Sequence, residues 1–193
     1  MEKWYLQDIY NVIRAMDEMS ARDKNCKREI LDLHENDMKK LLSFYRHLKN
    51  ENRQCLREMD QICHEKICED MAYALVYLDV YDPRVDMRRM CAAMDDVGFL
   101  YGLSGMIERG LVLVRRFVPK KGKIYSDIIH EYFCGDTRRT DEEVIDILPE
   151  WISRRQYYRE KREAIRWMGL FFFEVVIPRM RRDLIKHSQN SRT

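Results

Sequence analysis

Four arginines near the carboxyl end of the chain have the spacing needed to present a row of positive charge. Arg155, Arg159, Arg162 and Arg166 follow one another at intervals of 4, 3 and 4 residues, which places them on one side of an α-helix. A guanidinium group donates two parallel hydrogen bonds to a phosphate or to the edge of a guanine. We call these residues the arginine stripe, and the chemistry it indicates is recognition of a nucleic acid.

The helix that carries the arginine stripe has a recognisable start and an apolar side. Ser153 and Gln156 match a capping box, in which the hydroxyl accepts a hydrogen bond from an early backbone N–H and the Gln side chain reaches back to the cap. Arg154 also lies in the first turn, the part of a recognition helix that reaches the bases. The residues expected to face a core lie opposite the stripe: Tyr157, Ala164, Met168 and Phe171.

A short helix is predicted immediately before this one. Thr140 and Glu143 match a second capping box, and Pro149 disfavours helical conformation at the residue before it, so the helix should end after about two turns. Helix, tight turn and helix form the unit that places a second helix in the DNA major groove. The alternative is a solvated surface helix whose Glu160 and Glu163 pair with the neighbouring arginines.

This part of the chain resembles a known DNA-binding unit. The run ISRRQYYREKREAIRWMG resembles the second helix of the helix-turn-helix in sigma-70 region 4 and in phage-encoded regulators of the ArpU and RinA type. The preceding IYSDIIHEYFCGDTRRTDEEVIDIL resembles the helix, linker and first helix that lead into it. The resemblance covers about 123–169 and implies DNA binding for transcriptional control of phage or mobile-element genes in a bacterium. Carried over by position, the DNA-facing residues are Ser153, Arg154, Arg155, Gln156, Tyr158, Arg159 and Arg162, and the arginine stripe adds Arg166.

The chain departs from those families at the start of the first helix. Asp141, Glu142 and Glu143 suit the positive end of the helix dipole but would face phosphate poorly. Nothing before Lys123 resembles the promoter-melting motifs of sigma-70. The resemblance therefore implies a helix-turn-helix unit and not a complete sigma factor.

Composition predicts a helical protein with an uneven distribution of charge. The chain has 193 residues, 46% of them hydrophobic, with only 7 Gly and 4 Pro, which favours a nearly all-α fold with a buried core. The net charge is +2, but residues 151–187 hold ten Lys or Arg against four Asp or Glu, and residues 1–150 carry a net −5. A polyanion would be attracted to the C-terminal helix and not to the remainder.

The first half of the chain contains a heptad pattern. Apolar positions recur at alternating steps of 3 and 4, which is typical of a coiled coil or of a long helix packed in its own domain. Both arrangements remain open from the pattern alone. The seam consists of Leu31, His34, Met38, Leu41, Tyr45, Leu48, Asn52, Cys55, Met59 and Ile62.

We predict an all-α protein with two domains. Residues 1–118 form an N-terminal long-helix bundle or coiled-coil hairpin, and residues 123–187 form a helix-turn-helix unit with an extended last helix. Pro119, Lys120, Lys121 and Gly122 mark the boundary, and residues 188–193 form a disordered tail. The apolar extension Phe171–Ile177 would dock onto the N-terminal helices or onto a second copy.

A glycine-containing helix is predicted from about Arg84 to Phe117. Its four glycines would be tolerated if another helix packs closely against them or if the helix breaks between Gly102 and Gly105. The run Leu111–Val114 is β-prone, so a short strand is an alternative. Charged residues interrupt this segment well within the ~20 residues that a membrane span requires, so no span is predicted.

Enzymatic motifs are absent from the sequence. There is no Gly-rich phosphate loop, nucleophile elbow or His-Glu-x-x-His pair, so we expect neither catalysis nor a cofactor. The six cysteines show no small-domain framework and indicate reduced thiols in a cytoplasmic protein. Cys63, His64 and Cys68 have spacing that would allow a shared metal, but a fourth tetrahedral ligand is hard to supply from one helix, so no metal site is predicted.

Three functions fit these observations. The leading hypothesis is a regulator that binds duplex DNA and meets RNA polymerase, with a homodimer formed through the Leu31–Ile62 seam or the Phe171–Ile177 extension. The second is a helical interaction module or inhibitor whose arginine stripe meets an acidic protein. The third is an RNA-binding protein in which Tyr157 and Tyr158 stack on unpaired bases.

Overall fold

The computed structural model of the protein describes residues 10–14, 18, 24–51 and 97–182. Across these residues the chain is 85% helical and no residue lies in a strand, which confirms the all-α prediction. Two π-helical turns, η1 and η2, continue α8 and α10. The elements are α2 (Lys24–Leu33), α3 (Glu35–Glu51), α7 (Val97–Phe117), α8 (Gly122–Ile129), η1 (His130–Cys134), α9 (Asp141–Ile147), α10 (Arg154–Phe171) and η2 (Phe172–Val176).

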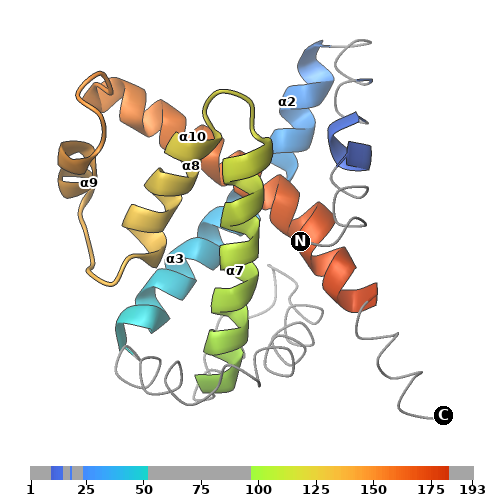
Figure 1. The fold of residues 1–193 in the computed structure, drawn as a ribbon, viewed down its shortest axis with the longest axis horizontal. Helices are drawn as coiled ribbons and strands as arrows, with labels where there is room; N and C mark the ends of the chain where they lie inside the picture. Colours follow the sequence, from blue (N-terminus) through green and yellow to red (C-terminus); the bar gives the residue numbers. More distant parts are fainter. Residues whose placement is uncertain (1–9, 15–17, 19–23, 52–96, 183–193) are drawn as a thin grey trace.

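Helix α10 organises the packing, since it contacts α2, α3, α7 and α8 as it crosses the molecule (Figure 1). The main buried cluster joins α3 and α7 to α10 and η2 through side chains such as Leu41, Leu103, Met168 and Phe172, each 0% exposed. This cluster takes residues from both sides of the turn that follows α7. The division of the chain into domains at that turn stays a prediction.

The predicted long helix of the heptad seam is interrupted at His34, where α2 ends and α3 begins. At this break α10 approaches closely, because a Cβ atom on Gly169 would lie 3.0 Å from both the Cβ atom and the carbonyl oxygen of His34. The expectation of one continuous helix is therefore wrong over this part. Five seam residues are buried within the chain, and the positions from Asn52 onward lie outside the described residues: Leu31, Met38, Leu41, Tyr45 and Leu48.

The apolar extension of α10 docks onto helices of its own chain. Phe171, Phe172 and Val176 are 0% exposed and belong to the same buried cluster as residues of α3 and α7. His34 adds a polar contact, since its ring nitrogen Nε2 lies 2.8 Å from a carboxylate oxygen of Glu174. Of the two expected docking partners for this extension, the structure shows the N-terminal helices.

Helix α7 is continuous from Val97 to Phe117, so neither a break near its glycines nor a strand at Leu111–Val114 occurs. Gly110 supports the alternative of close packing, because a Cβ atom there would lie 2.5 Å from the terminal methyl of Met168 on α10. None of the helices in the described part of the chain is long and apolar enough to cross a bilayer.

We predict that Gly122→Ala lowers the free energy of unfolding by about 1–3 kcal/mol. The new Cβ atom would lie 2.5 Å from the carbonyl oxygen of Val114 and 2.7 Å from that of Arg115, and backbone atoms cannot move aside cheaply. Gly110→Ala is the matched control, since its two tight contacts are with the flexible end of the Met168 side chain and its third, with Phe172 at 3.7 Å, is an ordinary van der Waals contact. Urea denaturation measures both variants, and a Gly122→Ala protein as stable as the wild type would contradict a close α7–α8 turn.

Candidate nucleic-acid interface

Both predicted capping boxes are present. At α9, the backbone N–H of Glu143 donates to the hydroxyl of Thr140 (3.3 Å), and the Glu143 carboxylate accepts from the backbone N–H of Thr140 (2.6 Å). At α10, Ser153 and Gln156 make the same two contacts, each at 3.3 Å. Helix α9 ends at Ile147, two residues before Pro149, so both helices begin, and α9 ends, where local chemistry predicts.

A small apolar cluster fixes α9 and the start of α10 to α8. Val144 projects from α9, Ile128 from α8 and Tyr157 from α10, and all three are 0% exposed. Leu148 and Ile152, which flank the connection between α9 and α10, complete the cluster. The first half of α10 is therefore held from one side, and its opposite side faces solvent.

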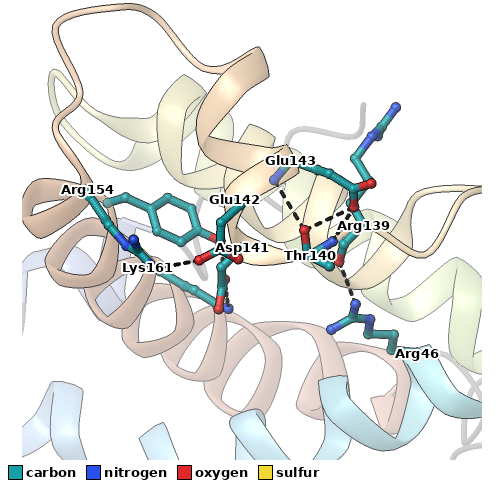
Figure 2. Close-up of polar contacts among 9 residues, drawn as sticks. Arg46, Arg139, Thr140, Asp141, Glu142, Glu143, Arg154 and Lys161 are labelled. Atoms are coloured by element: carbon teal, nitrogen blue, oxygen red, sulfur yellow. Dashed lines mark hydrogen bonds and ion pairs between the residues drawn. The ribbon is translucent and has the colours of Figure 1, made fainter.

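The acidic start of α9 faces α10. Asp141 accepts hydrogen bonds from the Tyr157 hydroxyl and from Lys161, both at 2.6 Å (Figure 2). Burial alone would raise the pKa of Asp141, but these two bonds outweigh it and lower the pKa below its usual range. Glu142 pairs with Arg154 at 2.5 Å. These carboxylates are thus occupied by α10, which accounts for acidic residues beside a basic helix.

Most of the predicted DNA-facing residues lie on the exposed side of α10. The side chains of Arg154, Arg159 and Arg162 are 69%, 65% and 59% exposed. Ser153, Arg155 and Tyr158 are also exposed, while Gln156 is half-buried by its capping role. Arg155 makes no ion pair with any residue that the structure describes.

Arg166 is the one predicted site residue that is buried. It is 5% exposed, and its guanidinium contacts Glu35 at 2.7 Å, Asp32 at 2.5 Å and Glu163 at 2.5 Å. Burial alone would lower the pKa of Arg166, but hydrogen bonds to Glu35 and Glu163 raise it overall. The expectation that all four arginines of the stripe face solvent is wrong for Arg166. The C-terminal half of α10 is packed in the core, so most side chains from here onward are covered by neighbouring helices.

A buried carboxylate on α10 binds two cations at the edge of the exposed surface. Glu160 is 3% exposed, and its carboxylate contacts Lys121 at 2.7 Å and Arg159 at 3.0 Å and accepts a hydrogen bond from the Tyr125 hydroxyl at 3.0 Å. Burial raises the pKa of Glu160, but these donors outweigh it and the pKa is lowered overall. The sequence indicated a pair with a neighbouring arginine, but it gave no signal for Lys121 or Tyr125.

Two other expectations concern stacking and metal binding. Tyr157 is 0% exposed, so of the tyrosine pair only Tyr158 is available to stack on a base. Cys63, His64 and Cys68 lie outside the described residues. Elsewhere, over 24–51 and 97–182, no three His, Cys, Asp or Glu side chains converge as metal ligands.

Comparison of the chain with protein-family models, curated proteins and solved structures found no match. Function is therefore inferred from the residues and their geometry.

We predict that Glu160→Gln lowers the free energy of unfolding by about 1–3 kcal/mol near pH 7. Because the pKa of Glu160 is lowered by folding, its contribution is present above the unfolded pKa of about 4.3 and is lost as the pH falls through the folded pKa. The difference between variant and wild type should therefore shrink below about pH 4. Denaturation curves at both pH values test this.

Glu150→Gln is the control for that substitution, since Glu150 is exposed and forms no ion pair within the described part of the chain. Equal destabilisation by Glu160→Gln at neutral and at acid pH would show that the carboxylate charge is not what holds Lys121 and Arg159 together.

Proposed function

We propose that the protein binds duplex DNA through the first half of α10 and acts as a transcriptional regulator. The observation that carries the proposal is the exposed set Arg154, Arg155, Arg159 and Arg162, on a helix whose opposite side is anchored by 0%-exposed Tyr157. Guanidinium groups on a rigid helix can bind phosphates and the edges of guanines without the backbone first being ordered. Arg166 is left out of the proposed contacts because it is buried.

The arrangement around α10 supports a helix-turn-helix interpretation. Two helices with capping boxes, α9 and α10, are joined by a short connection at Pro149 and share an apolar cluster with α8. In such a unit the second helix enters the major groove and its N-terminal residues contact the bases. Together with the resemblance to sigma-70 region 4 and to phage regulators of the ArpU and RinA type, this supports a role at promoters, with RNA polymerase as a further partner.

The internal ion pairs of these arginines are compatible with DNA binding. Arg154 pairs with Glu142 and Arg162 pairs with Glu35, but each arginine side chain is more than half exposed. The pair of Arg154 with Glu142 is exposed on both sides and contributes only about 0–1 kcal/mol, so a phosphate can replace Glu142 at small cost. Glu35 is mostly buried, but it keeps Arg166 as a partner when Arg162 turns to a phosphate. Binding should then depend steeply on salt, because each phosphate contact releases counterions.

A second candidate function is binding of an acidic protein surface. The same ion pairs favour it, since Arg154 and Arg162 already bind carboxylates, the group that an acidic partner would offer. The two candidates are separated by the retention of duplex DNA at low salt.

A homodimer through either predicted surface receives no support from the described residues. Leu41 and Tyr45 of the seam and Phe171 of the extension are at most 2% exposed within a single chain. We therefore propose that the DNA-binding unit is presented by one chain.

We predict that Arg155→Ala combined with Arg159→Ala weakens binding to random duplex DNA by at least tenfold at about 50 mM salt. The slope of log affinity against log salt should fall by about 0.9 for each phosphate that the variant no longer neutralises. Fluorescence anisotropy between about 50 and 200 mM salt measures both quantities.

The matched control combines Arg14→Ala with Arg28→Ala. These arginines are 81% and 73% exposed, and they lie on segments whose Val12 and Leu31 pack near Leu170, toward the other end of α10. The control removes the same charge and should leave affinity nearly unchanged. Equal loss of affinity in both variants would mean that binding follows net charge, and no binding by the wild type would refute the proposed function.

A further inference from the structure

A second basic segment lies outside the arginine stripe. Residues 109–126 contain six Lys or Arg and no Asp or Glu, although residues 1–150 as a whole carry a net −5. The segment covers the end of α7, the turn, and the start of α8. Its positive residues are Arg109, Arg115, Arg116, Lys120, Lys121 and Lys123.

The structure places this segment beside the exposed surface of α10. Lys121 in the turn and Arg159 on α10 contact the same carboxylate oxygen of Glu160, at 2.7 and 3.0 Å. One buried anion therefore binds two cations from elements far apart in the sequence. The group formed by Lys121, Arg159 and Glu160 has two positive charges and one negative charge, so it keeps a net positive charge. Figure 1 shows the α7–α8 turn passing next to α10.

The turn holds its lysines in a defined backbone conformation. Gly122 donates to the carbonyl of Val118 at 3.2 Å, and Lys121 donates to that of Pro119 at 2.7 Å. Lys120 has a φ of 63°, in the left-handed region, so the tight turn sets the direction in which its Cα–Cβ bond leaves the backbone. Lys120 and Lys123 are both exposed. Cations on an ordered backbone lose less conformational freedom on binding than cations on a flexible tail.

We propose that the α7–α8 turn is a second contact surface for the DNA that α10 binds, with Lys120 and Lys123 contacting backbone phosphates. This inference rests on the proposed function. Lysine is suited to this role because its ammonium is a point charge with three donors, which binds phosphate without reading sequence. Arg155 and Arg159 on α10 then supply base and phosphate contacts, while the turn fixes the position of the duplex beside them.

The test is a variant that combines Lys120→Asn with Lys123→Gln, measured against random duplex DNA by fluorescence anisotropy over about 50–200 mM salt. Asn tolerates the left-handed backbone of Lys120, so the fold should be retained, and circular dichroism melting checks this. Arg14→Gln with Arg28→Gln is the control of equal charge. We expect the turn variant to bind about 5- to 50-fold more weakly with a salt slope smaller by about 1.8, and the control to match the wild type.

The outcomes separate this inference from the proposed function. Wild-type affinity and salt slope in the turn variant, with the wild type itself binding DNA, would overturn the second surface and leave α10 as the binding element. Equal losses of affinity in the turn variant and the control would also overturn it, since the effect would then be one of net charge. Absence of DNA binding by the wild type would overturn both.

Discussion

The close crossing of α10 over the α2–α3 junction is the constraint on which the remaining structure depends. The two backbones approach closely because residue 169 is glycine: a Cβ atom there would lie 3.0 Å from the Cβ atom and the carbonyl oxygen of His34. The next two residues of α10, Leu170 and Phe171, are both buried. The C-terminal half of α10 thus belongs to the core. Its N-terminal half, held by Tyr157 and the α8–α9 cluster, projects its arginines into solvent. One helix therefore supplies both the anchor and the proposed contact surface.

Ion pairs with carboxylates fix the positions of several arginine side chains on α10. Glu35 binds both Arg162 and Arg166 at 2.7 Å, and together with Asp32 it draws Arg166 into the core. Glu160 acts at the other side, where it joins Arg159 to Lys121 of the preceding turn. The same type of interaction removes one arginine from the surface and connects another to a second basic segment. The position of each arginine relative to the core, and not the number of arginines, determines which of these side chains a polyanion could contact.

Local features of the structure were predictable from the sequence, and long-range ones were not. The capping boxes at Thr140 and Ser153 involve residues three positions apart, so spacing alone predicts them. The burial of Arg166 depends on Glu35, 131 residues away, and the ion pair of Lys121 with Glu160 spans 39 residues. No periodicity within a helix carries such information. The break at His34 was also hidden, because seam positions continue in phase on both sides of it.

The most direct test of the central claim is site-specific photocrosslinking to duplex DNA from a benzoylphenylalanine placed at Tyr158 or, as the control, at Tyr10. Both tyrosines are exposed, at 45% and 58%, but only Tyr158 lies on the proposed contact surface of α10. We predict a crosslink from position 158 that salt suppresses, and none from position 10. Crosslinking from position 10 alone, or equally from both positions, would contradict the assignment of DNA binding to the first half of α10.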